Sequence, residues 1–281
     1  MSSTESTDAE RVLYIAEASS GLLRLTIPLS DEAVVAGQAT TVELVSFELS
    51  DHTPIEYADD VAIGKSGMVY FSDASDIIPS RIPGTPKRVD TYSASVVDAL
   101  RGKRSGKLLM YDPVRKETSV VFDGIWFANG VTLSEDESFA LINETFMARV
   151  LKVYLEGSKR GEVEVFADGF PGYVDGVSIS STGHVHVAIP TPAPGTADAL
   201  SRIKPSWLNR FFRTIVLALP FPIGPVNFGC FVTLDMQGNV LNTWVDEKGE
   251  VASFVTAVEE RDGKAYLGSL TQDRVVVVDL A

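Results

Sequence analysis

Three oxygen-bearing side chains, Asp59, Asn129 and Asp175, stand at the same position of a six-residue sequence motif that occurs three times and is called the repeated phrase below. The copies are Ala58-Asp59-Asp60-Val61-Ala62-Ile63, Ala128-Asn129-Gly130-Val131-Thr132-Leu133 and Val174-Asp175-Gly176-Val177-Ser178-Ile179. If each copy begins one structural repeat around an axis, the three side chains converge on that axis. Carboxylate and amide oxygens from separate segments suit Ca²⁺, which takes about six to eight oxygen ligands in a flexible shell. The spacing therefore predicts a metal site formed by these three residues.

Other interpretations of these residue types stay open at this point. Asp-Gly and Asn-Gly pairs are common in turns, and Asp59-Asp60 is also compatible with simply beginning a strand, so the repeated phrase has a purely structural interpretation as well. His184 and His186 alternate on one face of an expected strand, where they form either a metal or acid–base pair or an ordinary polar face. Glu144, at the end of another expected strand, either lines a central channel or forms a buried ion pair with Arg149.

The surrounding pattern indicates β-structure. Apolar runs of four to six residues alternate with turn pairs such as Ser66-Gly67, Asp112-Pro113 and Thr182-Gly183. The segment 127–170 contains four such runs in about 45 residues, the size of a propeller blade. Because the unit recurs, the sequence favours an all-β propeller over a β-sandwich. We count three complete blades and two partial ones.

Two insertions interrupt the repeats. From residue 129 to residue 175 is 46 positions, whereas from 59 to 129 is 70, and the excess falls in the segment 77–104. Within it, residues 91–101 are expected to form a short helix. The second insertion, 190–228, contains an apolar helical face at Trp207, Phe211, Ile215 and Leu219. Both follow the second strand of a blade, where they serve either as lids or as packing over the propeller surface.

Composition limits the classes of partner. The formal net charge of -14 argues against binding to a phosphate backbone, so no nucleic-acid partner is expected. The most apolar stretch, 211–234, is interrupted by Arg213 and three prolines, so no transmembrane segment is expected. The first ten residues show no signal-peptide pattern, and the single Cys230 fits a reducing compartment, which makes a cytoplasmic location the default. We expect a disordered tail at 1–10 and one propeller domain at 11–281.

Several motifs in fixed order resemble the strictosidine synthase-like proteins over about residues 11–280. They are Tyr57-Ala-Asp-Asp-Val-Ala-Ile, Val69-Tyr-Phe-Ser-Asp-Ala-Ser, Trp126-Phe-Ala-Asn-Gly-Val-Thr-Leu-Ser, Glu144-Thr-Phe-Met-Ala-Arg-Val and Phe166-Ala-Asp-Gly-Phe-Pro-Gly-Tyr-Val-Asp-Gly-Val. The resemblance implies a six-bladed β-propeller related to paraoxonases and gluconolactonases, most of which hold calcium in a central channel and hydrolyse esters, lactones or organophosphates. Asp59, Asn129 and Asp175 match the metal-facing residues of that superfamily.

The sequence departs from the family's pattern in three ways, one of which is that the N-terminal membrane anchor of one family member has no counterpart in it. The first blade, which normally contributes a glutamate ligand, and the innermost strand of the second have no counterpart in this chain. Open edge strands would then allow pairing with another copy, so a homo-oligomer is conceivable. Thr256 stands where strictosidine synthase has its catalytic glutamate, and a threonine cannot act as that base near neutral pH.

These observations lead to the expectation of a calcium-dependent hydrolase of small esters or lactones. Calcium would polarise a carbonyl or phosphoryl oxygen while a carboxylate activates water or attacks directly. Asp175 is the first candidate for that carboxylate and Asp59 the second. The alternatives are a non-catalytic propeller that serves as a binding scaffold or is an incomplete gene product, and, less favoured because of Thr256, an alkaloid-forming synthase.

Overall fold

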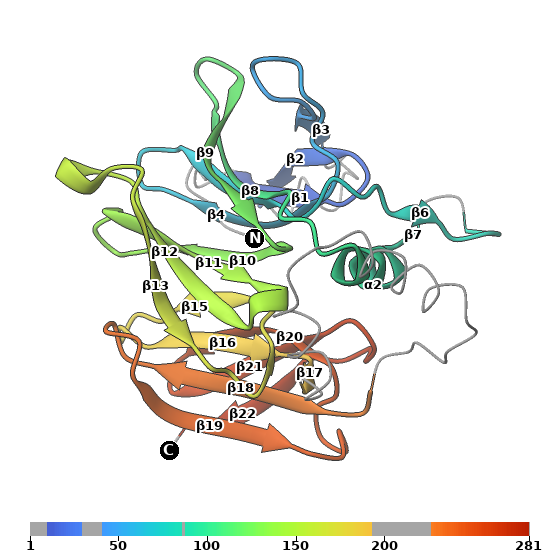
Figure 1. Cartoon of the computed structure of the whole chain (residues 1–281), viewed down its shortest axis with the longest axis vertical. Coiled ribbons are helices and arrows are strands. Elements are labelled where there is room, and N and C mark those ends of the chain that lie inside the picture. Colours follow the sequence, from blue (N-terminus) through green and yellow to red (C-terminus); the bar gives the residue numbers. More distant parts are fainter. Residues whose placement is uncertain (1–9, 30–40, 86–87, 193–225, 281) are drawn as a thin grey trace.

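The protein is a β-propeller whose blades follow one another along the chain (Figure 1). The computed structural model describes residues 10–29, 41–85, 88–192 and 226–280. Within these residues, five antiparallel sheets form the blades, three with four strands and two with three. This matches the predicted three complete and two partial blades, while the count of six stays a prediction. The predicted tail lies outside the described residues except for Glu10, which begins the first strand.

The five sheets are numbered here in chain order. Sheet 1 contains β1 (Glu10–Glu17), β2 (Gly21–Pro28) and β3 (Thr41–Ser46). Sheet 2 contains β4 (Ala58–Ile63), β5 (Val69–Asp73), β8 (Gly106–Asp112) and β9 (Glu117–Ile125). Sheet 3 contains β10 (Ala128–Leu133), β11 (Phe139–Glu144), β12 (Arg149–Tyr154) and β13 (Val163–Asp168). Sheet 4 contains β15 (Val177–Ile179), β16 (Val185–Ile189), β18 (Gly229–Leu234) and β19 (Val240–Asp246). Sheet 5 contains β20 (Val255–Arg261), β21 (Lys264–Ser269) and β22 (Val276–Asp279).

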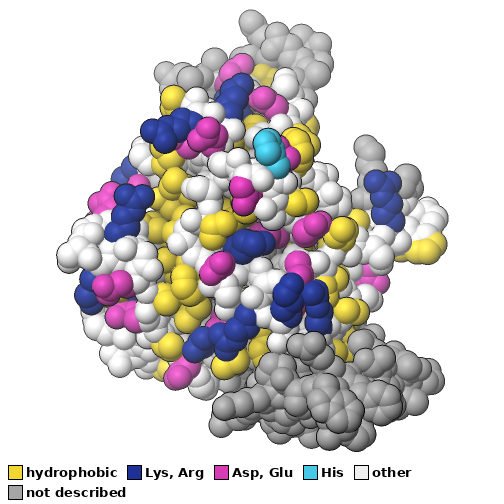
Figure 2. Space-filling view, turned by 45° about the horizontal axis from the view of Figure 1, so that its top comes forward, with side chains coloured by type: hydrophobic (Ala, Val, Ile, Leu, Met, Phe, Trp, Pro, Cys, Tyr) yellow, Lys and Arg dark blue, Asp and Glu magenta, His cyan; other side chains and the backbone are white. Residues whose placement is uncertain are grey.

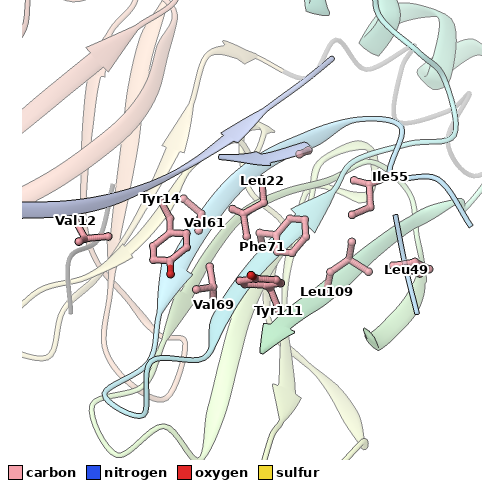
Figure 3. Packing of buried hydrophobic residues seen from close by; sticks show 11 residues of the cluster. Val12, Tyr14, Leu22, Leu49, Ile55, Val61, Val69, Phe71, Leu109 and Tyr111 are labelled. Carbon is pink, nitrogen blue, oxygen red and sulfur yellow. The ribbon is translucent and has the colours of Figure 1, made fainter. Parts of the chain in front are cut away.

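Apolar faces of consecutive sheets pack against each other and supply the core. Between sheets 1 and 2, Tyr14 and Leu22 meet Val69, Phe71 and Leu109, all almost fully buried (Figure 3). These positions alternate along their strands, so each strand turns one apolar face toward the neighbouring blade. Similar clusters lie between the later sheets. The period-two pattern of the sequence thus becomes the contact surface between blades.

The inner strands β4, β10, β15 and β20 are joined by hydrogen bonds from one blade to the next. The backbone N–H of Val131 donates to Asp60 Oδ2 at 2.9 Å, which links β4 to β10. The N–H of Gly130 donates to the Asp175 carbonyl at 2.9 Å, and the N–H of Gly176 donates to the Thr256 carbonyl at 3.0 Å. We call the region where these four strands meet the hub.

Glycine is required at two positions of the hub because the backbones approach so closely. A Cβ on Gly130 would lie 2.6 Å from the Asp175 carbonyl oxygen, and a Cβ on Gly176 would lie 2.5 Å from the Thr256 carbonyl oxygen. Neither glycine has a positive φ. The interpretation of the repeated phrase as a turn is therefore wrong: Asn129-Gly130 lies within a strand, and Gly176 is selected for close approach rather than for turn geometry.

The first insertion forms two short strands, β6 (Ser80–Arg81) and β7 (Val89–Asp90), followed by the helix α2 (Thr91–Arg101). The predicted short helix at 91–101 is confirmed. Asp90 caps its first turn by accepting from the Ser93 N–H, and Gly102 ends it in the left-handed conformation at φ 64°. Most of the second insertion, including its predicted helical face, lies outside the described residues; at its start, β17 (Thr191–Pro192) pairs with β14 (Gly172–Tyr173).

The remaining features are two 3-10 turns, the length of the helix and the distribution of charge on the surface. Two 3-10 turns, η1 (Thr145–Met147) and η2 (Gly157–Lys159), lie in sheet 3 loops. Helix α2 is too short to cross a membrane, and no other helix in the described part of the chain is long and apolar enough to do so. On the face shown in Figure 2, acidic and basic side chains are interspersed rather than gathered by sign.

Glu144 belongs to a buried ion-pair cluster at the end of β11. Its side chain is fully buried, and Oε2 accepts from Arg149 Nε at 2.6 Å. Oε1 accepts from the Trp126 N–H at 2.9 Å and lies 3.1 Å from Arg104 Nη1. Of the two roles left open by the sequence, the structure therefore supports the ion pair.

Replacing Gly130 by Ala is expected to destabilise the protein by about 1–3 kcal/mol, because the added methyl group meets rigid backbone of the next blade. Urea unfolding curves measure the change. Gly64→Ala is the matched control, since its Cβ would meet side chains rather than backbone, the carboxylate end of Glu137 at 2.9 Å and the Ser66 hydroxyl at 3.4 Å. Equal stability of the two variants would contradict the proposed packing of the hub.

Replacing Glu144 by Gln is expected to cost about 2–3 kcal/mol, because it leaves two arginines without their buried counter-charge. Partial exposure of Arg104 and Arg149 places the effect below that of a fully buried pair. Chemical denaturation of this variant beside the exposed control Glu117→Gln measures it. A loss of calcium affinity with unchanged stability would instead point to a channel role.

Candidate metal centre

The structure brings Asp59, Asn129 and Asp175 together at the hub. Asp59 lies on β4, Asn129 on β10, and Asp175 two residues before β15. The side-chain amide of Asn129 lies close enough to the Asp175 carboxylate to favour its charged form and lower its pKa. Asp59 is close enough for its charge to act on Asp175. Three residues separated by up to 116 positions in the chain, from 59 to 175, therefore share one site.

Both carboxylates are held in an environment that disfavours their charged form. Burial, followed by the charge of Asp60, raises the pKa of Asp59 to about 7. Burial also raises the pKa of Asp175 well above its usual value, and the charges of Asp59 and Asp60 raise it further. The nearby Asn129 amide opposes this effect only in part. Within the described residues, no Lys, Arg or His side chain lowers the pKa of Asp59 or Asp175.

The donor set fits a hard cation. Asp59 and Asp175 supply carboxylate oxygens, and the Asp59 carboxylate accepts no hydrogen bond from any described residue. A divalent ion between the two carboxylates would neutralise their mutual repulsion. The described part of the chain contains no metal-binding group of three or more His, Cys, Asp or Glu side chains. The oxygen-bearing side chains at this place are thus two Asp and one Asn.

Asp60 is next to Asp59 in sequence but has a different role. Its Oδ2 accepts from the Val131 N–H and its Oδ1 from its neighbour Val61 at 2.8 Å. Its own N–H donates to the Ser72 hydroxyl at 2.9 Å. Asp60 therefore fastens β4 to β10, in the position that glycine occupies in the other two copies of the phrase, while Asp59 faces the shared site.

Asn143 is a further hub residue that the sequence analysis did not single out. Its side chain is fully buried on β11, and Nδ2 donates to the Asp175 carbonyl at 2.6 Å. That carbonyl also accepts from Gly130. Asn143 thus helps to fix the backbone of Asp175. Nothing in the local sequence marks it, because Asn143 stands in an ordinary apolar strand outside the repeated phrase.

An aromatic residue stands two positions before the site position in every repeat. The four are Tyr57, Phe127, Tyr173 and Phe254, before Asp59, Asn129, Asp175 and Thr256. Tyr57 packs edge-to-face on Phe127 with ring centroids 5.5 Å apart. After burial, the charges of Asp59 and Asp175 raise the pKa of the Tyr57 phenol, which places Tyr57 beside both carboxylates. The sequence analysis missed Tyr57 and Phe254, although their fixed offset from the site position was a usable signal.

The histidines lie in an interblade contact rather than at this site. His186 is fully buried, with Nε2 2.8 Å from Glu260 Oε2 and Nδ1 3.1 Å from Thr233 Oγ1. His184 is half-exposed, and its Nδ1 is 3.6 Å from the same Glu260 oxygen. These contacts tie β16 to β20. Thr256, in the fourth equivalent position, contributes its carbonyl to the hub through Gly176.

Comparison with known proteins agrees with this architecture. A family model described as strictosidine synthase matches residues 59–158. The Arabidopsis thaliana Protein STRICTOSIDINE SYNTHASE-LIKE 13 is 32% identical over 269 residues, which cover 95% of this chain and 58% of that protein. The Homo sapiens Adipocyte plasma membrane-associated protein is 32% identical, over 80% of this chain and 53% of its own length. The chain thus spans less than two thirds of these relatives.

Solved structures share the fold at low sequence identity. A gluconolactonase from Xanthomonas campestris superposes with a TM-score of 0.58 at 11% identity, over 96% of this chain and 69% of its own. Regucalcin from Agrobacterium tumefaciens, described as a calcium-binding protein, gives a TM-score of 0.52 at 15% identity with the same coverage of both chains. Family model, relatives and fold agree, and the chain belongs to the strictosidine synthase-like family of β-propeller proteins.

Proposed function

We propose that the protein is a calcium-dependent hydrolase of small esters or lactones, with calcium held by Asp59, Asn129 and Asp175. The observation that carries the proposal is the pair of half-buried, mutually repelling carboxylates, for which the described residues offer no cationic side chain. Such a pair is costly without a cation. The names of two structural neighbours, a gluconolactonase and a calcium-binding regucalcin, are consistent with it.

The chemistry assigned to each residue follows from its hydrogen bonds. Bound calcium would supply a Lewis acid that polarises the substrate carbonyl oxygen. Asp59 accepts no hydrogen bond from a described residue, so a carboxylate oxygen of Asp59 that is not engaged with calcium would take a proton from the attacking water. Asp175 is fixed by the Asn129 amide and by the two donors to its carbonyl, which suits it to binding. The proposed order, Asp59 before Asp175, reverses the ranking made from the sequence.

The Tyr57 phenol keeps its proton, because burial and the two carboxylates raise its pKa. Its hydroxyl donates a hydrogen bond to the Thr91 carbonyl oxygen, with 3.1 Å between the two oxygens. Tyr57 and Phe127 together present apolar ring surface next to the carboxylates. A small apolar acyl group or lactone ring fits such a wall better than a charged substrate does.

Thr256 argues against alkaloid condensation as the activity. It stands at the site position of the fourth repeat, its side chain has no basic group, and its carbonyl is already bonded to Gly176. A non-catalytic binding propeller is the alternative outcome that the experiments below separate from a hydrolase.

Calcium is expected to raise the melting temperature of the wild-type protein, because it binds the folded hub and not the unfolded chain. Asn129→Ala and Asp175→Asn should each weaken calcium binding at least tenfold and reduce phenyl acetate hydrolysis to a comparable extent. Asp123→Asn, on the exposed part of β9, is the control and should change neither. A scaffold would show no calcium-dependent ester hydrolysis at all.

Asp59→Asn is expected to stabilise the calcium-free protein at pH 8 by about 1–2 kcal/mol, since one pKa unit corresponds to about 1.4 kcal/mol and partial exposure reduces the full value. The folded pKa of Asp59 lies above its unfolded value, so the group removes stability as pH rises from about 4 to 7. Wild type should therefore lose stability over that range more steeply than the variant. Parallel pH profiles of urea unfolding would contradict the electrostatics described for the hub.

A further inference from the structure

Helix α2 connects two blades that are not neighbours. At its first residue, the Thr91 carbonyl accepts from the Tyr57 hydroxyl, and Tyr57 immediately precedes β4 of sheet 2. One residue later, the Tyr92 ring packs edge-on against Phe254, with centroids 5.9 Å apart and planes at 62°. Phe254 immediately precedes β20 of sheet 5. Sheets 3 and 4 follow one another between these two blades in the sequence of hub hydrogen bonds.

The first turn of α2 therefore contacts the aromatic residues that precede two inner strands, Tyr57 before β4 and Phe254 before β20. Tyr57 lies beside Asp59 and Asp175, and Phe254 stands two residues before Thr256, at the equivalent place of the fourth repeat. Ala94, one turn along the helix, is buried against Tyr57 and Phe127. Tyr92 thus lies next to the ring of Phe254 and one residue from the carbonyl that Tyr57 binds.

Hydrogen bonds and an ion pair hold helix α2 in place at both ends. Asp90 accepts from both the N–H and the hydroxyl of Ser93 at the start. Near the other end, the fully buried Asp98 accepts from the Ser75 hydroxyl at 2.6 Å, and Arg101 pairs with Asp76. Ser75 and Asp76 directly follow β5, so the helix is fastened to the same blade that carries Asp59.

We infer that Tyr92 is a specificity-determining residue that restricts the hub site to small acyl groups and lactone rings and excludes bulky aryl groups. This inference rests on the proposed hydrolase function and adds to it the size class of the substrate. Its physical basis is steric: the Tyr92 ring packs on Phe254, the aromatic residue two positions before the fourth site position, and the neighbouring Thr91 is bonded to Tyr57 beside both carboxylates, so the ring narrows the space through which a large group reaches them.

The test compares Tyr92→Ala with wild type on two calcium-loaded reactions, hydrolysis of γ-butyrolactone and of 2-naphthyl acetate. The ratio of kcat/KM for the naphthyl ester to that for the lactone is expected to rise at least tenfold, with the value for the lactone changed less than about threefold. Val97→Ala, an exposed position on the same helix, is the control and should leave the ratio unchanged. Tyr92→Leu preserves apolar packing if the alanine variant folds poorly, and should give an intermediate ratio.

A binding measurement separates this inference from the proposed function. Titration of butyrate and 2-naphthoate, followed by thermal shift in calcium, gives the ratio of their dissociation constants without any turnover. A tenfold relative gain for naphthoate in Tyr92→Ala, with no ester hydrolysis by wild type, would support the role of Tyr92 and overturn the hydrolase. An unchanged size ratio in binding or in hydrolysis by a folded variant, or an equal loss for both sizes, would overturn the role of Tyr92.

Discussion

The direct contact of backbones at the hub is the constraint on which the rest of the structure depends. Four inner strands are joined by hydrogen bonds in which one blade's N–H reaches a carbonyl or carboxylate of the next. Such bonds form only if the strands approach more closely than side chains normally permit, and Gly130 and Gly176 permit it. Because the strands are so close, the residue before each glycine is brought toward its equivalents in the other blades. The geometry of the candidate site is thus a consequence of backbone packing.

That packing also explains why the site carries unfavourable electrostatics. Bringing Asp59 and Asp175 to one place removes water from both carboxylates and sets like charges against each other. A structure that needed only the interblade bonds could use neutral side chains here, as Thr256 illustrates in the fourth repeat. The same hub contains Asp60, whose carboxylate links β4 to β10 and accepts from two backbone N–H groups, which oppose in part the rise in its pKa caused by burial. The contrast between neighbouring aspartates separates a residue that holds the fold from one available for a ligand.

Much of this arrangement could be predicted from the sequence because it depends on local and repeating signals. The alternating apolar runs predicted the strands, the recurrent phrase predicted the blades, and the register of Asp59, Asn129 and Asp175 predicted that they would meet. Contacts between unrelated segments were not predictable. Asn143 stands in an ordinary strand and reaches Asp175 only through tertiary packing, and the contact between Tyr92 and Phe254 joins an insertion to a blade about 160 residues later. His186 and Glu260 likewise form their pair across blades.

In each of the four repeats, two adjacent residues meet different demands. The second residue is constrained by backbone packing at the hub, and the first carries the side chain of the candidate site. The residue that follows the site position is Asp60, Gly130, Gly176 or Ala257. The two glycines lie where a following inner strand is pressed against them, whereas Ala257 is exposed on the last inner strand, so a methyl group is accommodated there. The first position, with Asp59, Asn129, Asp175 and Thr256, has no such backbone limit and its side chains differ. A propeller of this kind therefore keeps its fold through the second position while the chemistry of its hub changes through the first, and the aromatic residue two places earlier shapes the space in which that chemistry takes place.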